Sequence, residues 1–68
     1  MTYWDIKNIV KGKRAPLAYE NECLENAIIE EGADDEGHFY RLTVAQHNGW
    51  CKVMHYYETG TITEEYTK

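Results

Sequence analysis

The dipeptide Asn48-Gly49 constrains this chain most, because it lies between two runs in which apolar and polar residues alternate. An Asn-Gly pair in that setting predicts a two-residue β-hairpin loop, since both residues tolerate the positive φ angles that such a loop requires. A second turn signal, Thr59-Gly60, follows the next run. Residues 38–67 are therefore predicted to form a three-stranded antiparallel meander.

The two predicted loops determine which side chains share a face, because side chains alternate between the two faces of a strand. Val44 is expected opposite Val53, and Leu42 opposite His55. A shift of one residue would exchange the two faces. The more apolar face, which we expect to meet the helices, carries Tyr40, Leu42, Val44, Cys51, Val53, His55, Tyr57, Ile62, Glu64 and Tyr66.

The other face of the predicted meander is rich in aromatic residues. Aromatic residues, Met and Arg are enriched at protein interfaces, so we expect this face to bind another protein or a second copy of the chain. The alternative is that Trp4 or the N-terminal helix covers part of it. The expected partner-binding residues are Phe39, Arg41, Trp50, Met54 and Tyr56.

The segment before the meander carries signals for a short first helix. Thr2 can cap its start, and Asp5 three residues later completes a capping box. Apolar residues follow at helical spacing, and Gly12 suits the position just after the helix end. The sequence therefore predicts a helix of about ten residues that needs packing for stability.

A second helix is predicted to follow, so that residues 1–32 are helical. Pro16 suits its first turn, and Gly32 suits its end; a later start near Asn21 is the alternative. The 68 residues are expected to form one domain, since a chain of this length has only a small core. The predicted fold is α+β, with two helices packed on one face of a three-stranded antiparallel meander.

The charge of the chain is concentrated in one segment. The net charge is −5, which disfavours direct contact with nucleic acid or with an anionic membrane surface. On the predicted helix and the following loop, the acids would form a ridge that is either solvated surface or a contact for a basic partner. This acidic ridge comprises Glu20, Glu22, Glu25, Glu30, Glu31, Asp34, Asp35 and Glu36.

The sequence offers no arrangement of residues that points to catalysis or metal binding. The three histidines and two cysteines lack the close spacing of zinc ligands. His55 and Glu64 are expected to be cross-strand neighbours, and we interpret them as a structural polar pair rather than as a general base. We expect no enzymatic activity, no catalytic residues, no metal or other cofactor, and no small-molecule substrate.

The cellular location is inferred from what the chain contains. The longest apolar run is Ala27-Ile28-Ile29, so no membrane-spanning segment is expected, and no secretion signal is evident. Cys23 and Cys51 are then expected to be free thiols, as is usual in a reducing compartment. The sequence thus predicts a cytoplasmic protein.

The pattern Asn48-Gly49-Trp50, Tyr56-Tyr57, Thr59-Gly60-Thr61 and Glu64-Glu65-Tyr66 resembles small uncharacterised proteins of bacterial phages and mobile elements. The resemblance covers residues 40–66 and implies an accessory protein that binds and blocks a host factor. The leading hypothesis is a small non-catalytic protein-binding module. The alternative is an acidic inhibitor that mimics nucleic acid and occupies a host DNA- or RNA-binding protein, as phage antagonists of host defence do.

Overall fold

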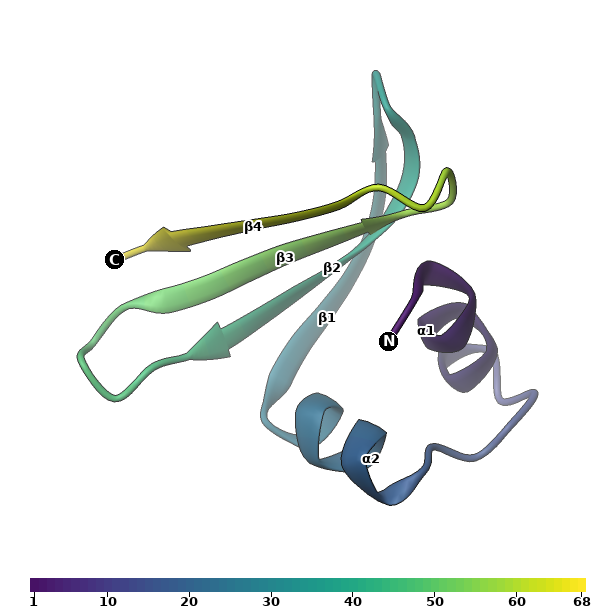
Figure 1. Cartoon of the computed structure of the whole chain (residues 1–68), viewed down its shortest axis with the longest axis horizontal. Coiled ribbons are helices and arrows are strands. Elements are labelled where there is room, and N and C mark those ends of the chain that lie inside the picture. The colour runs from purple at the N-terminus through teal and green to yellow at the C-terminus, as the bar shows by residue number, and fades with distance from the viewer.

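Two short helices precede a four-stranded antiparallel sheet in this computed structural model, which describes residues 1–68 (Figure 1). Neither helix is long and apolar enough to cross a membrane. The α+β class is confirmed, whereas the predicted number of three strands was wrong. The elements are α1 (Tyr3–Val10), α2 (Ala18–Glu25), β1 (Ala27–Asp34), β2 (Gly37–Ala45), β3 (Cys51–Tyr57) and β4 (Ile62–Thr67), and the strands lie side by side in the order β1-β2-β3-β4.

The first helix begins and ends where the local signals predict. The Thr2 hydroxyl accepts a hydrogen bond from the Asp5 backbone N–H at 3.2 Å, and the Asp5 carboxylate accepts one from the Thr2 N–H at 3.0 Å. These bonds satisfy two N–H groups that have no partner within a helix. Gly12 follows the helix with a φ of 73°, a conformation that glycine adopts without strain. The predicted capping box is confirmed.

Residues 27–32, predicted to continue the second helix, form the strand β1 instead, together with residues 33–34 of the predicted loop. Ile28 and Ile29 are β-branched and favour a strand. The whole segment pairs with β2, from Ala27 opposite Val44 to Asp34 opposite Gly37. Eight consecutive pairs outweigh a helical turn that only local propensity supports, so α2 ends at Glu25.

The β2–β3 loop is one residue longer than predicted. The Gln46 N–H donates to the Trp50 carbonyl oxygen at 2.7 Å, so these two residues flank a three-residue loop. Only Gly49 has a positive φ, 84°, whereas the predicted two-residue loop requires this of Asn48 too. The Asn48 side-chain oxygen instead accepts a hydrogen bond from the Trp50 N–H at 3.1 Å.

The longer loop turns β3 over relative to the prediction. The residues of β2 and β3 that now face the helices are Tyr40, Leu42, Val44, Lys52, Met54 and Tyr56. The prediction for β3 was wrong: Cys51, Val53, His55 and Tyr57 lie on the opposite face. The β3–β4 loop is also one residue longer, since the Tyr57 N–H donates to the Thr61 carbonyl oxygen. The two shifts cancel, and Ile62, Glu64 and Tyr66 of β4 lie on the predicted side.

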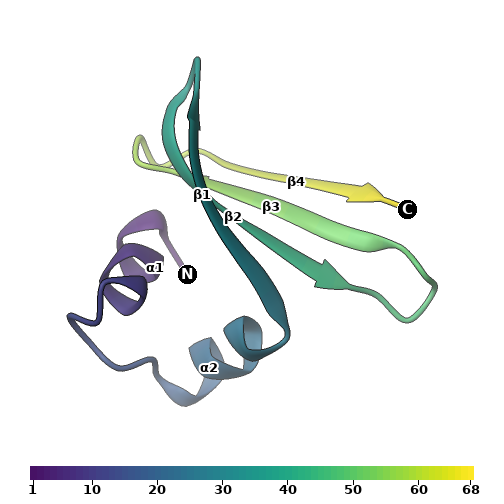
Figure 2. The ribbon, with the colours of Figure 1, turned by 180° about the vertical axis from the view of Figure 1, so that it is seen from behind.

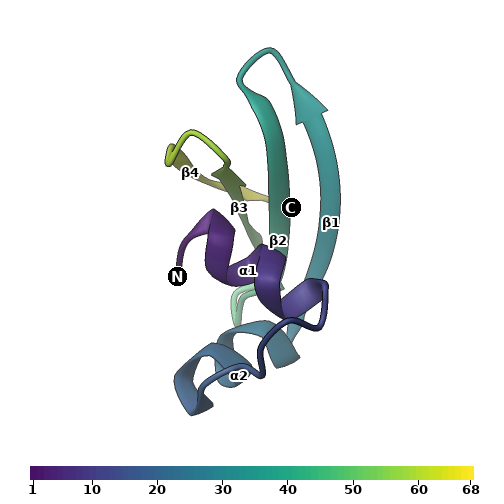
Figure 3. The ribbon, with the colours of Figure 1, turned by 90° about the vertical axis from the view of Figure 1, so that its right-hand side faces the viewer.

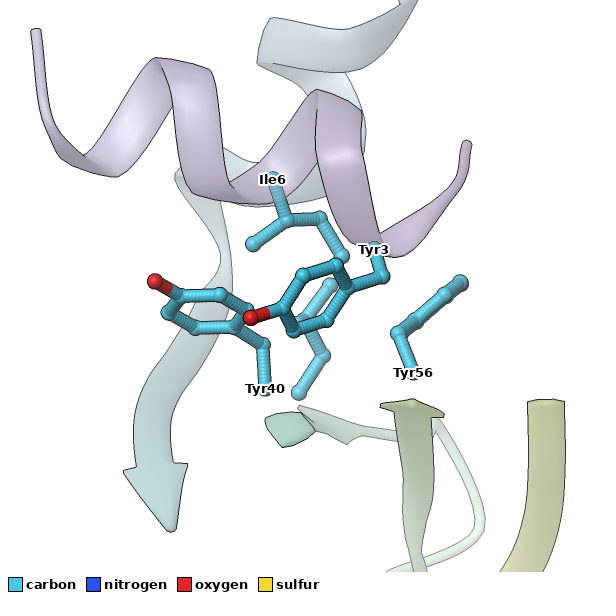
Figure 4. Close-up of a cluster of buried hydrophobic side chains, with 5 residues drawn as sticks. Tyr3, Ile6, Tyr40 and Tyr56 are labelled. Carbon is cyan, nitrogen blue, oxygen red and sulfur yellow. The ribbon is translucent and has the colours of Figure 1, made fainter. Parts of the chain in front are cut away.

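The main core lies between α1 and the middle of the sheet (Figure 4). Tyr3 and Ile6 of α1 contact a buried group on β2 and β3 that consists of Tyr40, Leu42 and Tyr56. Seen from the side, both helices lie on the same side of the sheet, and α1 crosses in front of β2 (Figure 3). From α2, only Leu24 packs against this cluster, and it is only partly buried. The helices therefore cover the middle of the sheet, whereas β4 at its edge stays exposed.

A second, smaller cluster lies on the face that carries no helix. The Phe39 ring packs across β1 at Gly32, and its centroid lies 4.9 Å from that of His55 and 5.5 Å from that of Tyr57. The Tyr57 hydroxyl donates to the Asp34 carboxylate at 2.8 Å. Gly32 was predicted to end a helix, and this was wrong: its missing side chain makes room for the Phe39 ring.

Candidate functional site

The uncovered part of the helix-facing sheet surface forms a groove of about 400 Å³ between α2 and the sheet. We call it the α2 groove. Its floor consists of Leu42, Val44, Met54 and Tyr56, and its wall on the α2 side consists of Tyr19, Glu22, Cys23 and Asn26. Seven of its eleven lining residues are hydrophobic. Protein pockets of this kind accept apolar groups, and a few polar residues orient the bound group.

The groove borders α2, a short helix that covers little of the sheet. The helix has eight residues and touches the core cluster through Leu24 alone. Tyr19, on the groove wall, is 59% exposed. A helix this short is not stable by itself, so its position depends on Leu24 and on contacts made by its first turn.

Those contacts centre on Glu20, which the sequence assigned to the acidic ridge. Its carboxylate accepts two hydrogen bonds from the Arg14 guanidinium, both at 2.8 Å, and one from the Leu17 N–H at 2.9 Å. Arg14 also donates to Asp5 at 3.1 Å and so connects α2 to α1. The bonds from Arg14, followed by the backbone bond, lower the pKa of Glu20 to about 2. This carboxylate is buried and engaged, so it is not free for a partner.

Strand β4 extends the groove floor toward the edge of the sheet. Tyr56 lies opposite Ile62, and Lys52 lies opposite Tyr66. Ile62 and Tyr66 are 53% and 54% exposed. Strand β4 forms the edge of the sheet opposite β1, the strand that follows α2 (Figures 1 and 2). Between Ile62 and Tyr66, the Glu64 carboxylate forms an ion pair with Lys52 Nζ and accepts a hydrogen bond from the Tyr66 hydroxyl, each at 3.2 Å. The helix-facing surface of β4 is thus apolar except for the ion pair between Lys52 and Glu64.

The five predicted partner-binding residues do not share a surface. Met54 and Tyr56 lie together in the α2 groove. Phe39 is buried on the opposite face, where Arg41 lies beside it and pairs with Glu30. Trp50 lies next to the β2–β3 loop, with Lys68 Nζ 5.3 Å from its ring centre. The one-residue shift of β3 separates them, because it reverses the faces of β3 but not of β2.

The eight residues of the acidic ridge are also dispersed. The alternation of strand side chains places Glu30 and Glu31 on opposite faces, where they pair with Arg41 and His38. The ridge required a helix at residues that form β1, and that prediction was wrong. Glu20 is buried, Glu22 and Glu25 lie on α2, Glu30 and Glu31 lie on β1, and Asp34, Asp35 and Glu36 lie at the β1–β2 turn.

A polar chain beside the core joins α1 to the sheet. The Tyr3 hydroxyl lies 2.6 Å from His38 Nδ1, and His38 Nε2 lies 3.1 Å from the Glu31 carboxylate. Burial raises the pKa of Tyr3, and burial followed by the nearby Glu31 raises the pKa of Tyr40 to about 12. Both tyrosines are thus held in their protonated forms, which makes them poor bases or nucleophiles. We interpret the chain as a structural link.

The predicted His55–Glu64 pair was wrong. His55 lies opposite Thr63, and its ring packs against Phe39 on the face away from the helices. Glu64 lies opposite Met54 on the other face. Cys23 is exposed at the groove wall and Cys51 is half-buried, and both are free thiols.

No protein family, curated protein or solved structure matches this chain. The α2 groove is the one pocket that the fold forms. It adjoins the exposed apolar residues Ile62 and Tyr66 of β4.

Proposed function

We propose that this chain is a non-catalytic protein-binding module that uses the α2 groove, together with Ile62 and Tyr66, as its contact surface. The observation that carries the proposal is an apolar floor that continues into exposed apolar side chains on β4. Exposed apolar patches of this kind mark interaction sites more often than inert surface. Met54 and Tyr56 belong to residue types that are enriched at interfaces.

The groove favours a protein partner that inserts one or two apolar side chains. Met54 can adjust to different shapes because its side chain is unbranched and flexible. Glu22 and Lys52 at the rim offer one charge of each sign to polar groups around the inserted residue. The net charge of −5 would also increase the rate of encounter with a basic partner.

The cellular role that we propose is that of a cytoplasmic accessory protein of a phage or mobile element. The resemblance of residues 40–66 to such proteins supports this role. An acidic mimic of nucleic acid is the alternative, but it has less support. Its acids are spread over α2, β1 and the β1–β2 turn, and Glu20 is buried.

Two single substitutions test the assignment of the surface. We expect Tyr19→Glu, in the groove wall, to abolish capture of a partner from bacterial lysate by the immobilised chain. Ile28→Glu is the matched control, because Ile28 is 65% exposed on the opposite face of the sheet. Both variants should retain the circular dichroism spectrum of the parent.

The outcome separates the two functional classes. A partner that both variants lose, or that neither loses, would contradict the groove assignment. Capture that depends steeply on salt, and that disappears when Asp34 and Asp35 are replaced by Lys, would favour the acidic mimic instead. Capture through the groove should persist in moderate salt, because apolar burial is not screened.

A further inference from the structure

Strand β4 is an edge that nothing in the chain covers. All six of its residues are exposed, and it lies at the border of the sheet (Figures 1 and 2). An edge strand presents unpaired N–H and C=O groups, and proteins usually block it with charged side chains, proline, a bulge or a covering loop; the charges on β4 are Glu64 and Glu65. β4 contains no proline, and it pairs with β3 through six consecutive residues without a bulge. It is therefore able to accept another strand.

The hydrogen-bond pattern shows which backbone groups are free. The Tyr57 N–H donates to the Thr61 carbonyl oxygen at 2.9 Å. In an antiparallel ladder, hydrogen-bonded and non-hydrogen-bonded pairs alternate. The backbone groups of Thr63, Glu65 and Thr67 consequently point toward β3. Those of Ile62, Glu64 and Tyr66 point outward from the edge of the sheet.

We propose that β4 pairs in antiparallel orientation with β4 of a second copy of this chain, with the twofold axis at Glu64. This register uses the outward N–H and C=O groups of all three free positions. It places Ile62 opposite Tyr66 of the second copy, and Thr63 opposite Glu65 of the second copy. Apolar side chains then meet on the helix-facing side, and hydroxyl groups meet carboxylates on the other side.

The neighbouring symmetric registers fit less well. A shift of the twofold axis to Thr63 places Glu64 opposite Ile62 of the second copy, and a shift to Glu65 places Glu64 opposite Tyr66. Either shift sets a carboxylate against an apolar side chain on the helix-facing side, which cross-strand pairing disfavours. Only the register centred on Glu64 lets like residue types meet in every helix-facing pair.

That register does oppose two Glu64 carboxylates, and the structure reduces the repulsion. Each carboxylate already forms an ion pair with Lys52 Nζ and accepts a hydrogen bond from the Tyr66 hydroxyl, both at 3.2 Å. The interaction with Glu64 raises the pKa of Lys52, so Lys52 keeps its positive charge. Each copy therefore brings its own counter-charge to the contact. Some repulsion between the two Glu64 carboxylates remains, so removing the charge at this position should strengthen the dimer.

A second copy is the occupant that the size of the chain favours. Only nine of 68 residues are buried, and chains this small commonly gain stability from association. A contact between two six-residue strands falls below the roughly 1,200 Å² of a standard interface. We therefore expect a weak dimer whose population depends on protein concentration and rises with salt, because each chain carries a net charge of −5.

The paired sheets would join the two grooves. Antiparallel strands in one continuous sheet keep equivalent faces on the same side, so both α2 grooves would open on one face. Ile62 and Tyr66 from both copies would form the floor between them. This consequence rests on the proposed function of the groove, whereas the pairing of β4 does not.

Sedimentation equilibrium with charge variants tests the pairing. Thr63→Lys places Lys opposite Glu65 of the second copy at two symmetric positions, and we expect the dimer to become about two- to thirtyfold tighter. Glu64→Gln removes the opposed carboxylates and should also tighten it. Ile62→Lys should weaken it. Glu58→Gln is the control, because it makes the same change of net charge on an exposed residue outside β4.

Amide hydrogen exchange measured by NMR locates the contact. The N–H groups of Ile62, Glu64 and Tyr66 should gain protection as the concentration rises, while those of Thr63 and Glu65 should change little. A chain that stays monomeric at its solubility limit would overturn the proposal. So would a dimer in which Thr63→Lys and Glu64→Gln act no differently from Glu58→Gln. If the dimer forms as described but Tyr19→Glu leaves partner capture intact, only the proposed function of the groove fails.

Discussion

Replacing Gly32 by Ala should destabilise the fold, although the backbone at this position accepts any residue. A Cβ atom at Gly32 would lie 2.8 Å from Cζ of Phe39 and 3.1 Å from a neighbouring ring carbon, closer than two carbon atoms approach. The Phe39 ring cannot move aside easily, because it is 7% exposed and lies between Gly32 and the rings of His55 and Tyr57. The overlap must therefore be relieved by shifts of several packed groups.

Two opposing effects determine the size of the change. Gly→Ala at a position without strain stabilises a protein by about 0.4–1 kcal/mol, because the unfolded chain loses freedom. Overpacking a filled site costs about 1–3 kcal/mol. The second effect is larger, so the free energy of unfolding of Gly32→Ala should fall by about 1 kcal/mol. For a domain of this size the melting temperature should fall by about 4–8 °C.

Urea unfolding, followed by the fluorescence of Trp4 and Trp50, measures this change. In a double-mutant cycle, Phe39→Leu removes the ring that Gly32→Ala would overlap, so the two losses should not add. Gly12→Ala is the control: its φ of 73° is strained for Ala, but no atom lies within 4 Å of the added Cβ. Its loss should add to that of Phe39→Leu. A Gly32→Ala variant that gains stability, or that shows no coupling with Phe39→Leu, would refute the reasoning.

Three further predictions concern the helices, and unfolding measurements check each. Ile6 is fully buried, so Ile6→Ala should lower the free energy of unfolding by about 2–5 kcal/mol; Leu24→Ala should lower it less, because Leu24 is only partly buried. Thr2→Ala removes the hydroxyl of the capping box, with an expected loss of about 0.5–2 kcal/mol. Glu20 has a folded-state pKa of about 2, below its ordinary 4.5, so it stabilises the fold above pH 4.5 and loses this effect as the pH falls toward 2. Glu20→Gln should remove that part of the acid sensitivity of thermal unfolding, and an unchanged pH profile would contradict the role of the Arg14–Glu20 pair.

Local chemistry was sufficient to predict some elements of the fold. Thr2, Asp5 and Gly12 define the first helix by themselves, because capping depends on residues within one turn. The strands β2, β3 and β4 were predicted from alternation and from turn residues. Their existence depends on short-range patterns, whereas their register depends on loop geometry that one residue can change.

The strand β1 could not be predicted in the same way. Ala27 and Ile28 continue the helical spacing of Leu17 and Leu24, so local periodicity favoured a helix. The pairing with β2 is a hairpin that closes between Asp34 and Gly37 without any of the turn pairs that marked the other two loops, and it satisfies an edge of β2 that would otherwise be open. A signal was present in the sequence: two adjacent β-branched residues followed by Gly32 are typical of a strand in which another side chain approaches the backbone closely.

The length of the β2–β3 loop decides which surface this protein can offer to a partner. With a two-residue loop, Val53 and His55 would have faced α1, and Met54 and Tyr56 would have joined Phe39 on the far side. In the observed register, Tyr56 packs beside Tyr3 in the core (Figure 4). The loop then needs only one positive φ, at Gly49, so core packing and loop strain favour the same arrangement. Met54 borders the core on one side and the α2 groove on the other, which means that the requirement to bury Tyr56 also places the groove floor.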